Sequence, residues 1–114
     1  MLKKSGMAIP LPAIIEKYVA ASNRHDVNAI LACFSDDAIV HDEREEHRGK
    51  KAIEGWIVKT IGKYKFQFKP LAVKDGNAEI VVTTEVSGTF DGSPVTLDYH
   101  FTIEKDKIAS LAIG

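Results

Sequence analysis

The residue of this 114-residue chain that is best suited to chemistry is Asp42, which follows the apolar stretch Ala38-Ile39-Val40. Alternate residues of a strand point to the same side, so Asp42 continues the inward face of that stretch. Burial raises the pKa of a carboxyl group, because the charged form loses water, and a raised pKa makes a usable base near neutral pH. The sequence therefore predicts Asp42 as a catalytic acid or base at the mouth of a pocket. The competing interpretation is a solvated strand end, or an ion pair with Arg44 or Arg48.

Two tyrosines are the candidate hydrogen-bond donors. Tyr18 falls on the apolar stripe of a predicted helix, and Tyr99 falls on the apolar side of a predicted strand. A buried phenol needs a hydrogen-bond partner, and a ligand in a cavity is one way to supply it. Simple packing in the core is the competing interpretation for both side chains.

Four apolar residues are predicted to contact a ligand in the same pocket: Trp56, Val40, Leu97 and Phe101. His41 is one more candidate, although strand alternation turns it to the side opposite Asp42. The four histidines and the single cysteine show no spacing typical of metal ligands, so the sequence predicts no metal site.

Composition limits the class of protein. The chain is 45% hydrophobic and 27% charged, with a formal net charge of -1, as expected for one globular domain. It has no basic stripe that would indicate a nucleic-acid partner. One cysteine cannot form an internal disulfide, and no stretch resembles a signal peptide or a membrane span. We therefore expect a cytoplasmic protein that binds neither nucleic acid nor membrane.

Three helices are predicted in the first half of the chain. Apolar residues recur with helical spacing from Leu11 to about Asn23, and Asp26 is placed to cap a second, short helix. Ser35-Asp36-Asp37 is expected to end that helix, and residues 50–62 form the third, with Gly62 at its end. Between the apolar stretch and the third helix, residues 44–48 are predicted to be a solvated charged loop, which could act as a lid.

After Gly62 the pattern changes to the alternation of strands, over residues 65–74, 77–88, 95–104 and 108–113. Asp75-Gly76 is predicted to be a tight hairpin turn. Helices followed by strands indicate an α+β protein, with three N-terminal helices packed on a strongly curved, mainly antiparallel sheet. The concave side of such a sheet is only partly filled, so we expect a pocket there. Residues 1–10 are predicted to be a flexible arm, and 11–114 a single domain.

The run from Tyr18 to Trp56 resembles the nuclear transport factor 2-like superfamily, in particular its SnoaL-like and ketosteroid isomerase-like branches. The matching pieces are Ile15-Glu16-Lys17-Tyr18-Val19-Ala20-Ala21, Asn23, Asp26, Phe34-Ser35-Asp36-Asp37-Ala38, Asp42, Arg48-Gly49 and Ala52-Ile53. The resemblance implies a cone-shaped α+β fold and a homodimer formed through the outer face of the sheet.

The resemblance also implies roles for the candidate residues. In the isomerase branch, a tyrosine of the first helix donates to the enolate and an aspartate at the end of the first strand moves the proton, which matches Tyr18 and Asp42. Those enzymes carry a protonated carboxylic acid on a late strand as the second donor. Here that position holds Tyr99, and strand alternation turns the neighbouring Asp98 to the opposite, polar face.

Two functional hypotheses follow. The first is a cofactor-independent isomerase, dehydratase or cyclase, which abstracts a proton next to a carbonyl of a small apolar substrate; no phosphate-binding glycine loop is present to hold a cofactor. The second is a non-catalytic small-ligand-binding or interaction module with the same fold, in which Asp42 is tied to Arg44 or Arg48.

Overall fold

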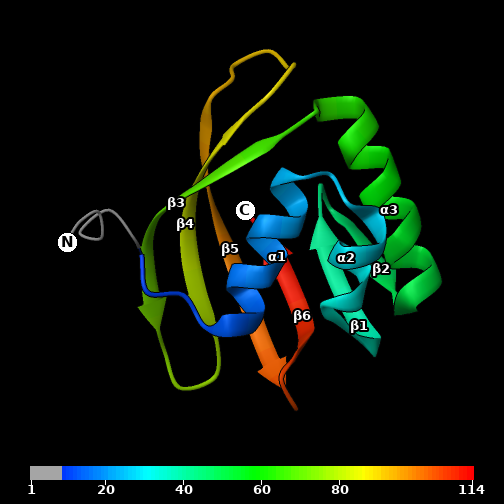
Figure 1. Cartoon of the computed structure of the whole chain (residues 1–114), viewed down its shortest axis with the longest axis vertical. Coiled ribbons are helices and arrows are strands. Elements are labelled where there is room, and N and C mark those ends of the chain that lie inside the picture. The colour runs from blue at the N-terminus through cyan, green and yellow to red at the C-terminus, as the bar shows by residue number, and fades with distance from the viewer. Residues whose placement is uncertain (1–8) are drawn as a thin grey trace.

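The protein is described from a computed structural model that covers residues 9–114. The predicted flexible arm falls mainly on residues 1–8, which lie outside the described residues. Helices and strands follow one another along the rest of the chain as Figure 1 shows. Their bounds are α1 Ala13–Asn23, α2 Val27–Ala32, β1 Phe34–Asp42, β2 Glu45–Arg48, α3 Gly49–Tyr64, β3 Gln67–Asp75, β4 Ile80–Ser87, β5 Val95–Glu104 and β6 Lys107–Ile113.

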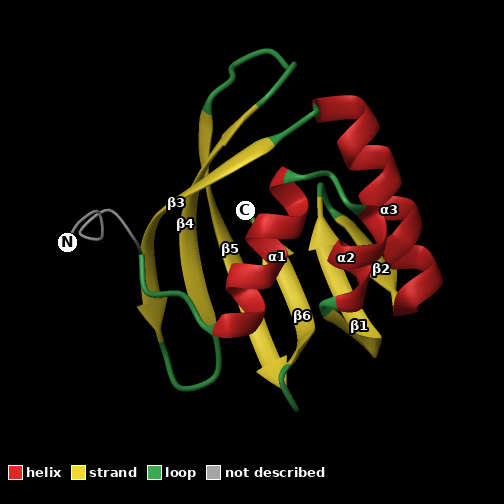
Figure 2. Ribbon diagram, in the orientation of Figure 1, coloured by secondary structure: helices red, strands yellow, loops and turns green. Residues whose placement is uncertain are grey.

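The strands form one curved sheet in the order β2-β1-β6-β5-β4-β3. The pair β1 and β6 is parallel, and every other neighbouring pair is antiparallel. All three helices pack on one face of this sheet (Figure 2). The predicted α+β architecture and the antiparallel arrangement of the last four strands are therefore confirmed. None of the helices in residues 9–114 is long and apolar enough to cross a membrane.

The predicted charged loop at residues 44–48 is wrong, because β2 pairs with β1 there as an antiparallel edge strand. The connection is a two-residue turn at Glu43-Arg44, where both residues have positive φ angles of 52° and 66°. Such turns match the twist of a hairpin but are usually built from asparagine and glycine, so the sequence did not signal one. Charged side chains suit an edge strand, since they discourage pairing with other chains.

The aspartate pair at Asp36-Asp37 is also part of β1 and does not end a helix. The pairing of β1 with β6 shifts register between Phe34 and Ile39, which leaves these two aspartates exposed at the irregularity. Further on, the strands β3 and β4 are joined by a longer loop than the predicted tight turn, with the Gly76 amide donating to the Glu79 carbonyl at 2.9 Å.

The start of α2 agrees with the prediction, whereas the end of α3 differs from it. The Asp26 side chain accepts a hydrogen bond from the Ala29 amide at 3.0 Å, as expected for the cap of α2. Helix α3 continues through Gly62 to Tyr64 and ends at Lys65, which adopts the left-handed conformation with φ of 48°. The two extra residues bring the Tyr64 side chain to the edge of the pocket described below.

A pair of hydrogen bonds joins the end of α1 to the edge strand β3. The Asn23 side chain donates to the Phe68 carbonyl at 3.0 Å and accepts from the Phe68 amide at 2.7 Å. The His25 ring nitrogen Nε2 donates to the Phe66 carbonyl at 2.7 Å. These bonds satisfy the free backbone groups of an edge strand and fix the open side of the sheet against the helix.

Gly88 lies where the loop after β4 touches the end of α3. A Cβ atom at this position would collide with the Tyr64 carbonyl oxygen and would lie 3.1 Å from the Phe90 ring. The Thr89 amide donates to the same Tyr64 carbonyl at 2.8 Å, so the loop cannot easily move away. Only glycine fits this contact.

We therefore expect Gly88→Ala to lower the free energy of unfolding by about 1–3 kcal/mol, the usual cost of overpacking. The matched control is Gly55→Ala in α3, where a Cβ atom meets nothing within 4 Å. Alanine there should raise the free energy of unfolding by about 0.5–1 kcal/mol, since it favours the helix. Urea unfolding measures both values, and a Gly88→Ala variant as stable as the wild type would contradict the predicted contact.

Candidate active site

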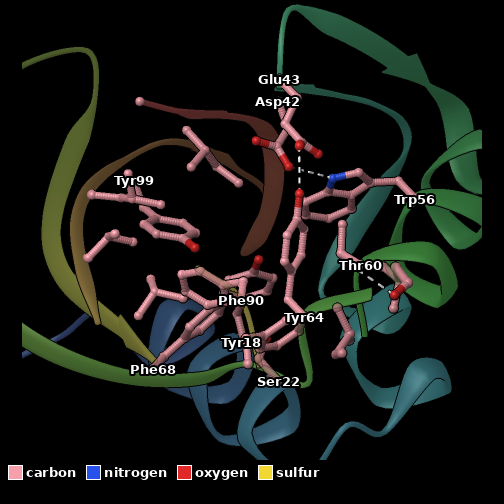
Figure 3. A pocket seen from close by; sticks show the side chains of 18 residues that line it. Tyr18, Ser22, Asp42, Glu43, Trp56, Thr60, Tyr64, Phe68, Phe90 and Tyr99 are labelled. Carbon is pink, nitrogen blue, oxygen red and sulfur yellow. Dashed lines mark hydrogen bonds between the residues drawn. The ribbon is translucent and has the colours of Figure 1, made fainter. Parts of the chain in front are cut away.

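A cavity of about 290 Å³ lies between the helices and the concave side of the sheet. Its walls are mainly aromatic and aliphatic, with contributions from Trp56, Phe66, Phe68, Phe90 and Leu97. Polar groups enter it from different elements, as Figure 3 shows. An apolar cavity with a few convergent polar groups is the usual form of a small-molecule site, and this one is at the small end of the range.

Asp42 is the last residue of β1, and its half-buried carboxylate lines the cavity. The Trp56 indole nitrogen Nε1 donates to Asp42 Oδ2 at 2.9 Å. Burial raises the pKa of Asp42, and the neighbouring Glu43 charge adds to this rise, while the bond from Trp56 opposes it. Within residues 9–114, neither Arg44 nor Arg48 forms an ion pair with Asp42. Trp56 is its side-chain partner.

Tyr18 and Tyr99 come from α1 and β5, and both line the cavity. Their side chains are buried, with 2% and 5% of their surface exposed, and their hydroxyl ends point into the same space (Figure 3). Burial raises the pKa of both phenols, and the Asp42 charge raises them further. Both phenols are therefore protonated at ordinary pH and can donate hydrogen bonds to a ligand. The structure brings together Asp42, Tyr18 and Tyr99.

The remaining predicted residues divide into two groups. Trp56 and Leu97 line the cavity. Val40 and Phe101 are not among the lining residues, and both lie in the packed core. Phe101, for example, packs edge-on against the Tyr18 ring at a centroid distance of 5.6 Å. We therefore do not propose Val40 or Phe101 as ligand contacts.

Two other polar residues of the prediction point away from the cavity. His41 is exposed, and its Nδ1 atom lies 3.9 Å from Glu46 Oε1 on the neighbouring edge strand. Asp98 accepts a hydrogen bond from Thr83 Oγ1 at 2.8 Å across β4 and β5, and it does not line the cavity, in agreement with the predicted strand alternation.

Tyr64 and Glu43 form a pair at the cavity mouth that was not predicted from the sequence. The Tyr64 hydroxyl donates to Glu43 Oε1 at 2.6 Å, which raises the pKa of Tyr64. Phe90 packs edge-on against the Tyr64 ring at 5.6 Å. Tyr64 was missed because the third helix was predicted to end at Gly62. The helical spacing of Ile57, Ile61 and Tyr64 was the signal that could have extended it.

Charge in the cavity has one sign. Among residues 9–114, the side chains that line the cavity include the carboxylates of Asp42 and Glu43 and no lysine, arginine or histidine. This arrangement repels anionic ligands and accepts neutral or cationic ones. Among the described residues, no three histidine, cysteine, aspartate or glutamate side chains are grouped so that they could hold a metal ion.

Comparison with known proteins agrees with this architecture. The family model of the SnoaL-like domain matches residues 15–111. A Sinorhizobium meliloti protein provisionally named a polyketide cyclase has a solved structure that is 38% identical, with a TM-score of 0.88, covering 91% of this chain and 95% of that protein. No curated protein matches the chain.

Two more distant structures share the fold. A Catenulispora acidiphila protein with a ketosteroid isomerase-like fold, in complex with trimethylamine, is 17% identical with a TM-score of 0.80, covering 92% of this chain and 86% of that one. The epoxide hydrolase/cyclase-like enzyme SalBIII, which acts in pyran ring formation in salinomycin, is 20% identical with a TM-score of 0.78, covering 89% and 86%.

The raised pKa of Asp42 predicts how stability depends on pH. The folded state holds this proton more tightly than the unfolded state does, so the contribution is fully present below about pH 4 and is lost as pH rises through the folded pKa. An asparagine side chain at this position would keep an acceptor for Trp56 without the charge. We therefore expect Asp42→Asn to gain stability relative to the wild type as pH rises from 4 to 8, measured by urea unfolding.

Asp98→Asn on the outer face of the sheet is the control, because it removes a carboxylate charge outside the cavity. A variant Asp42→Asn that is clearly less stable than the wild type at neutral pH would contradict the prediction, because it would mean that the charged form of Asp42 stabilises the fold.

Proposed function

This chain belongs to the SnoaL-like domain family of the nuclear transport factor 2-like superfamily, and from that premise we propose that it is a cofactor-independent isomerase, dehydratase or cyclase. Its substrate is a small, largely apolar carbonyl compound, and the reaction begins with abstraction of a proton next to the carbonyl. The observation that carries this proposal is the meeting of one desolvated carboxylate, Asp42, with two buried phenols, Tyr18 and Tyr99, in one apolar cavity.

Each group has a defined role in the first step. Asp42 takes the proton from the carbon next to the carbonyl, and the electron pair of that bond moves onto the carbonyl oxygen to give an enolate. Tyr18 and Tyr99 donate hydrogen bonds to the developing oxyanion, each of which can supply about 2.7–4 kcal/mol of transition-state stabilisation in a dry site. Trp56 holds the carboxylate in position through its bond to Oδ2.

The fate of the enolate distinguishes the three reaction types. Return of the proton from Asp42 to a different carbon is an isomerisation, and transfer to a leaving hydroxyl group is a dehydration. Attack of the enolate carbon on a second carbonyl closes a ring, and the proton held by Asp42 then passes to the new alkoxide oxygen. The names of the Sinorhizobium meliloti protein and of SalBIII both contain cyclase, which supports ring closure among these possibilities.

The volume of the cavity and the charge of its lining residues also indicate the size and charge of the substrate. Its volume of about 290 Å³ is roughly twice the 150 Å³ of an engineered apolar cavity that binds benzene, so a two-ring compound fits. Since its charged lining residues are both acidic, we propose an uncharged substrate without a carboxylate or phosphate group.

A second candidate function is non-catalytic binding of a small molecule. Aromatic walls beside two carboxylates also suit an organic cation, which cation–π attraction and charge would hold without reaction. The Catenulispora acidiphila protein, which has a complex with trimethylamine, supports this alternative. Asp42 would then act as a counter-ion and not as a base.

Deuterium exchange separates the two functions. We expect the wild type to accelerate exchange next to the carbonyl of 2-tetralone, an uncharged two-ring ketone, in D₂O, as measured by proton NMR. Asp42→Asn should lower the exchange rate about 10²-fold to 10⁴-fold, because it removes the base. Tyr18→Phe should lower the exchange rate about 10²-fold to 10³-fold, because it removes one hydrogen-bond donor to the oxyanion.

Glu43→Gln is the matched control, since it neutralises the neighbouring carboxylate at the mouth and leaves the proposed base in place. Exchange that stays at the background rate although the ketone binds would favour the non-catalytic function. An equal loss in Glu43→Gln and Asp42→Asn would contradict the assignment of Asp42 as the base.

We also propose a homodimer formed through the outer face of the sheet, which carries Thr96, Asp98, His100 and Thr102 on β5. Size-exclusion chromatography with light scattering should give twice the chain mass. Thr96→Lys with Thr102→Lys should give the monomer mass, because four like charges would meet across a two-fold axis. Lys59→Glu on the exposed side of α3 is the control, and a wild type that runs as a monomer would refute the dimer.

A further inference from the structure

One polar group on the cavity wall has no role in the mechanism so far. Ser22 lies one helical turn after Tyr18 on α1 and lines the same cavity. Its side chain is 1% exposed, and its Oγ atom is the buried side-chain oxygen or nitrogen in the described residues that lacks a hydrogen-bond partner. Leaving a buried hydroxyl unpaired costs about 1–3 kcal/mol. We therefore expect this hydroxyl to form a hydrogen bond when a ligand is bound.

Ser22 differs from a normal serine inside a helix. Such a hydroxyl usually donates to a backbone carbonyl in the preceding turn, and this satisfies it. Thr60, a second buried hydroxyl on the cavity wall, does so by donating to the Ile57 carbonyl at 3.2 Å. Ser22 makes no such bond. Its hydroxyl is therefore available to another acceptor, whereas that of Thr60 is not.

Tyr18 offers a hydroxyl for this role, because it lies one helical turn before Ser22 on α1, is also buried, and lines the same cavity. Ser22 lowers the pKa of Tyr18 against the larger effect of burial. Rotation about the Ser22 Cα–Cβ bond moves the Oγ atom, and this is the motion by which the hydroxyl would turn toward the Tyr18 oxygen. A phenol that accepts one hydrogen bond becomes a stronger donor of its own, because bonds in a chain polarise one another.

We propose that Ser22 is a positioning residue for Tyr18, and that its hydroxyl donates to the Tyr18 oxygen when Tyr18 donates to a ligand carbonyl. The inference rests on the proposed role of Tyr18 as a donor and extends it to a relay of two hydroxyls. The relay recognises an oxygen acceptor and is indifferent to the hydrocarbon part of the ligand.

The test compares two ligands that differ in one oxygen, 2-tetralone and the hydrocarbon tetralin. Trp56 is the single tryptophan of the chain and lines the cavity, so its fluorescence reports binding of both. We expect Ser22→Ala to weaken binding of 2-tetralone about fivefold to tenfold and to leave tetralin unchanged. The melting temperature should stay the same or rise, since an unpaired buried hydroxyl is removed.

Two further variants make the outcome specific. Thr60→Val removes the satisfied hydroxyl of similar burial, and it should leave the preference for 2-tetralone over tetralin unchanged. In a Tyr18→Phe background, Ser22→Ala should have no additional effect on that preference, because the relay has lost its middle member. Full additivity of the two substitutions would overturn the relay.

The proposal is also overturned if Ser22→Ala weakens the binding of 2-tetralone and tetralin equally, or if it lowers the melting temperature. It is likewise overturned if Ser22→Ala leaves the preference for 2-tetralone unchanged, or if the wild type shows no such preference. Its failure is distinct from failure of the proposed function. A coupled loss of preference without any catalysed exchange would uphold the Ser22 relay and refute the enzyme.

Discussion

The cavity depends first on the two hydrogen bonds between the Asn23 side chain and the backbone of Phe68. They hold the edge strand β3 against the end of α1, so the curved sheet cannot flatten or collapse onto the helix. The strand carries Phe68 and the helix carries Tyr18, and these two lining side chains pack against each other at a ring-centroid distance of 6.3 Å. The clamp therefore fixes the corner where the helix and the edge strand meet at the cavity wall. The cavity is thus shaped in part by side chain–backbone contacts made outside it.

A second constraint acts at the other end, where Asp42 precedes a tight turn. Glu43 and Arg44 both adopt positive φ angles, which non-glycine residues enter at some cost. The turn ends β1 at Asp42, so the carboxylate stands at the rim, where it is half buried and bonded by Trp56. Strain in the turn and desolvation of the carboxylate both reduce stability, which is the usual trade between stability and activity at a site.

The sequence predicts much of this arrangement because strands and helices have fixed periods. A period of two places Asp42 with Val40 and Tyr99 with Leu97, and a period of 3.6 places Tyr18 on the inward stripe of α1. Periodicity shows which face of a helix or strand a residue lies on. It does not show whether that part of the face borders the cavity or the packed core. That is why Val40 and Phe101, on the correct faces, lie in the packed core and not at the cavity wall.

The features that the sequence did not predict depend on contacts between distant segments. The hairpin that forms β2 lacks the usual turn residues, and its charged composition is typical of a loop. The loop after β4 packs on the end of α3 beside Tyr64, through the Thr89 amide and the contact at Gly88. No local pattern in the sequence encodes these contacts.

Ser22 and Thr60 show why substrate identity is harder to infer than fold. Both are small hydroxyl residues on the cavity wall, and they would look alike in a pattern of polar and apolar positions. Only the geometry shows that one hydroxyl is satisfied by its own helix and the other is not. Since clamps outside the cavity keep its shape, such lining residues can change without loss of the fold. Structures with distant sequences can therefore share this architecture while their cavities recognise different ligands, and the chemistry of each has to be read from its own unpaired groups.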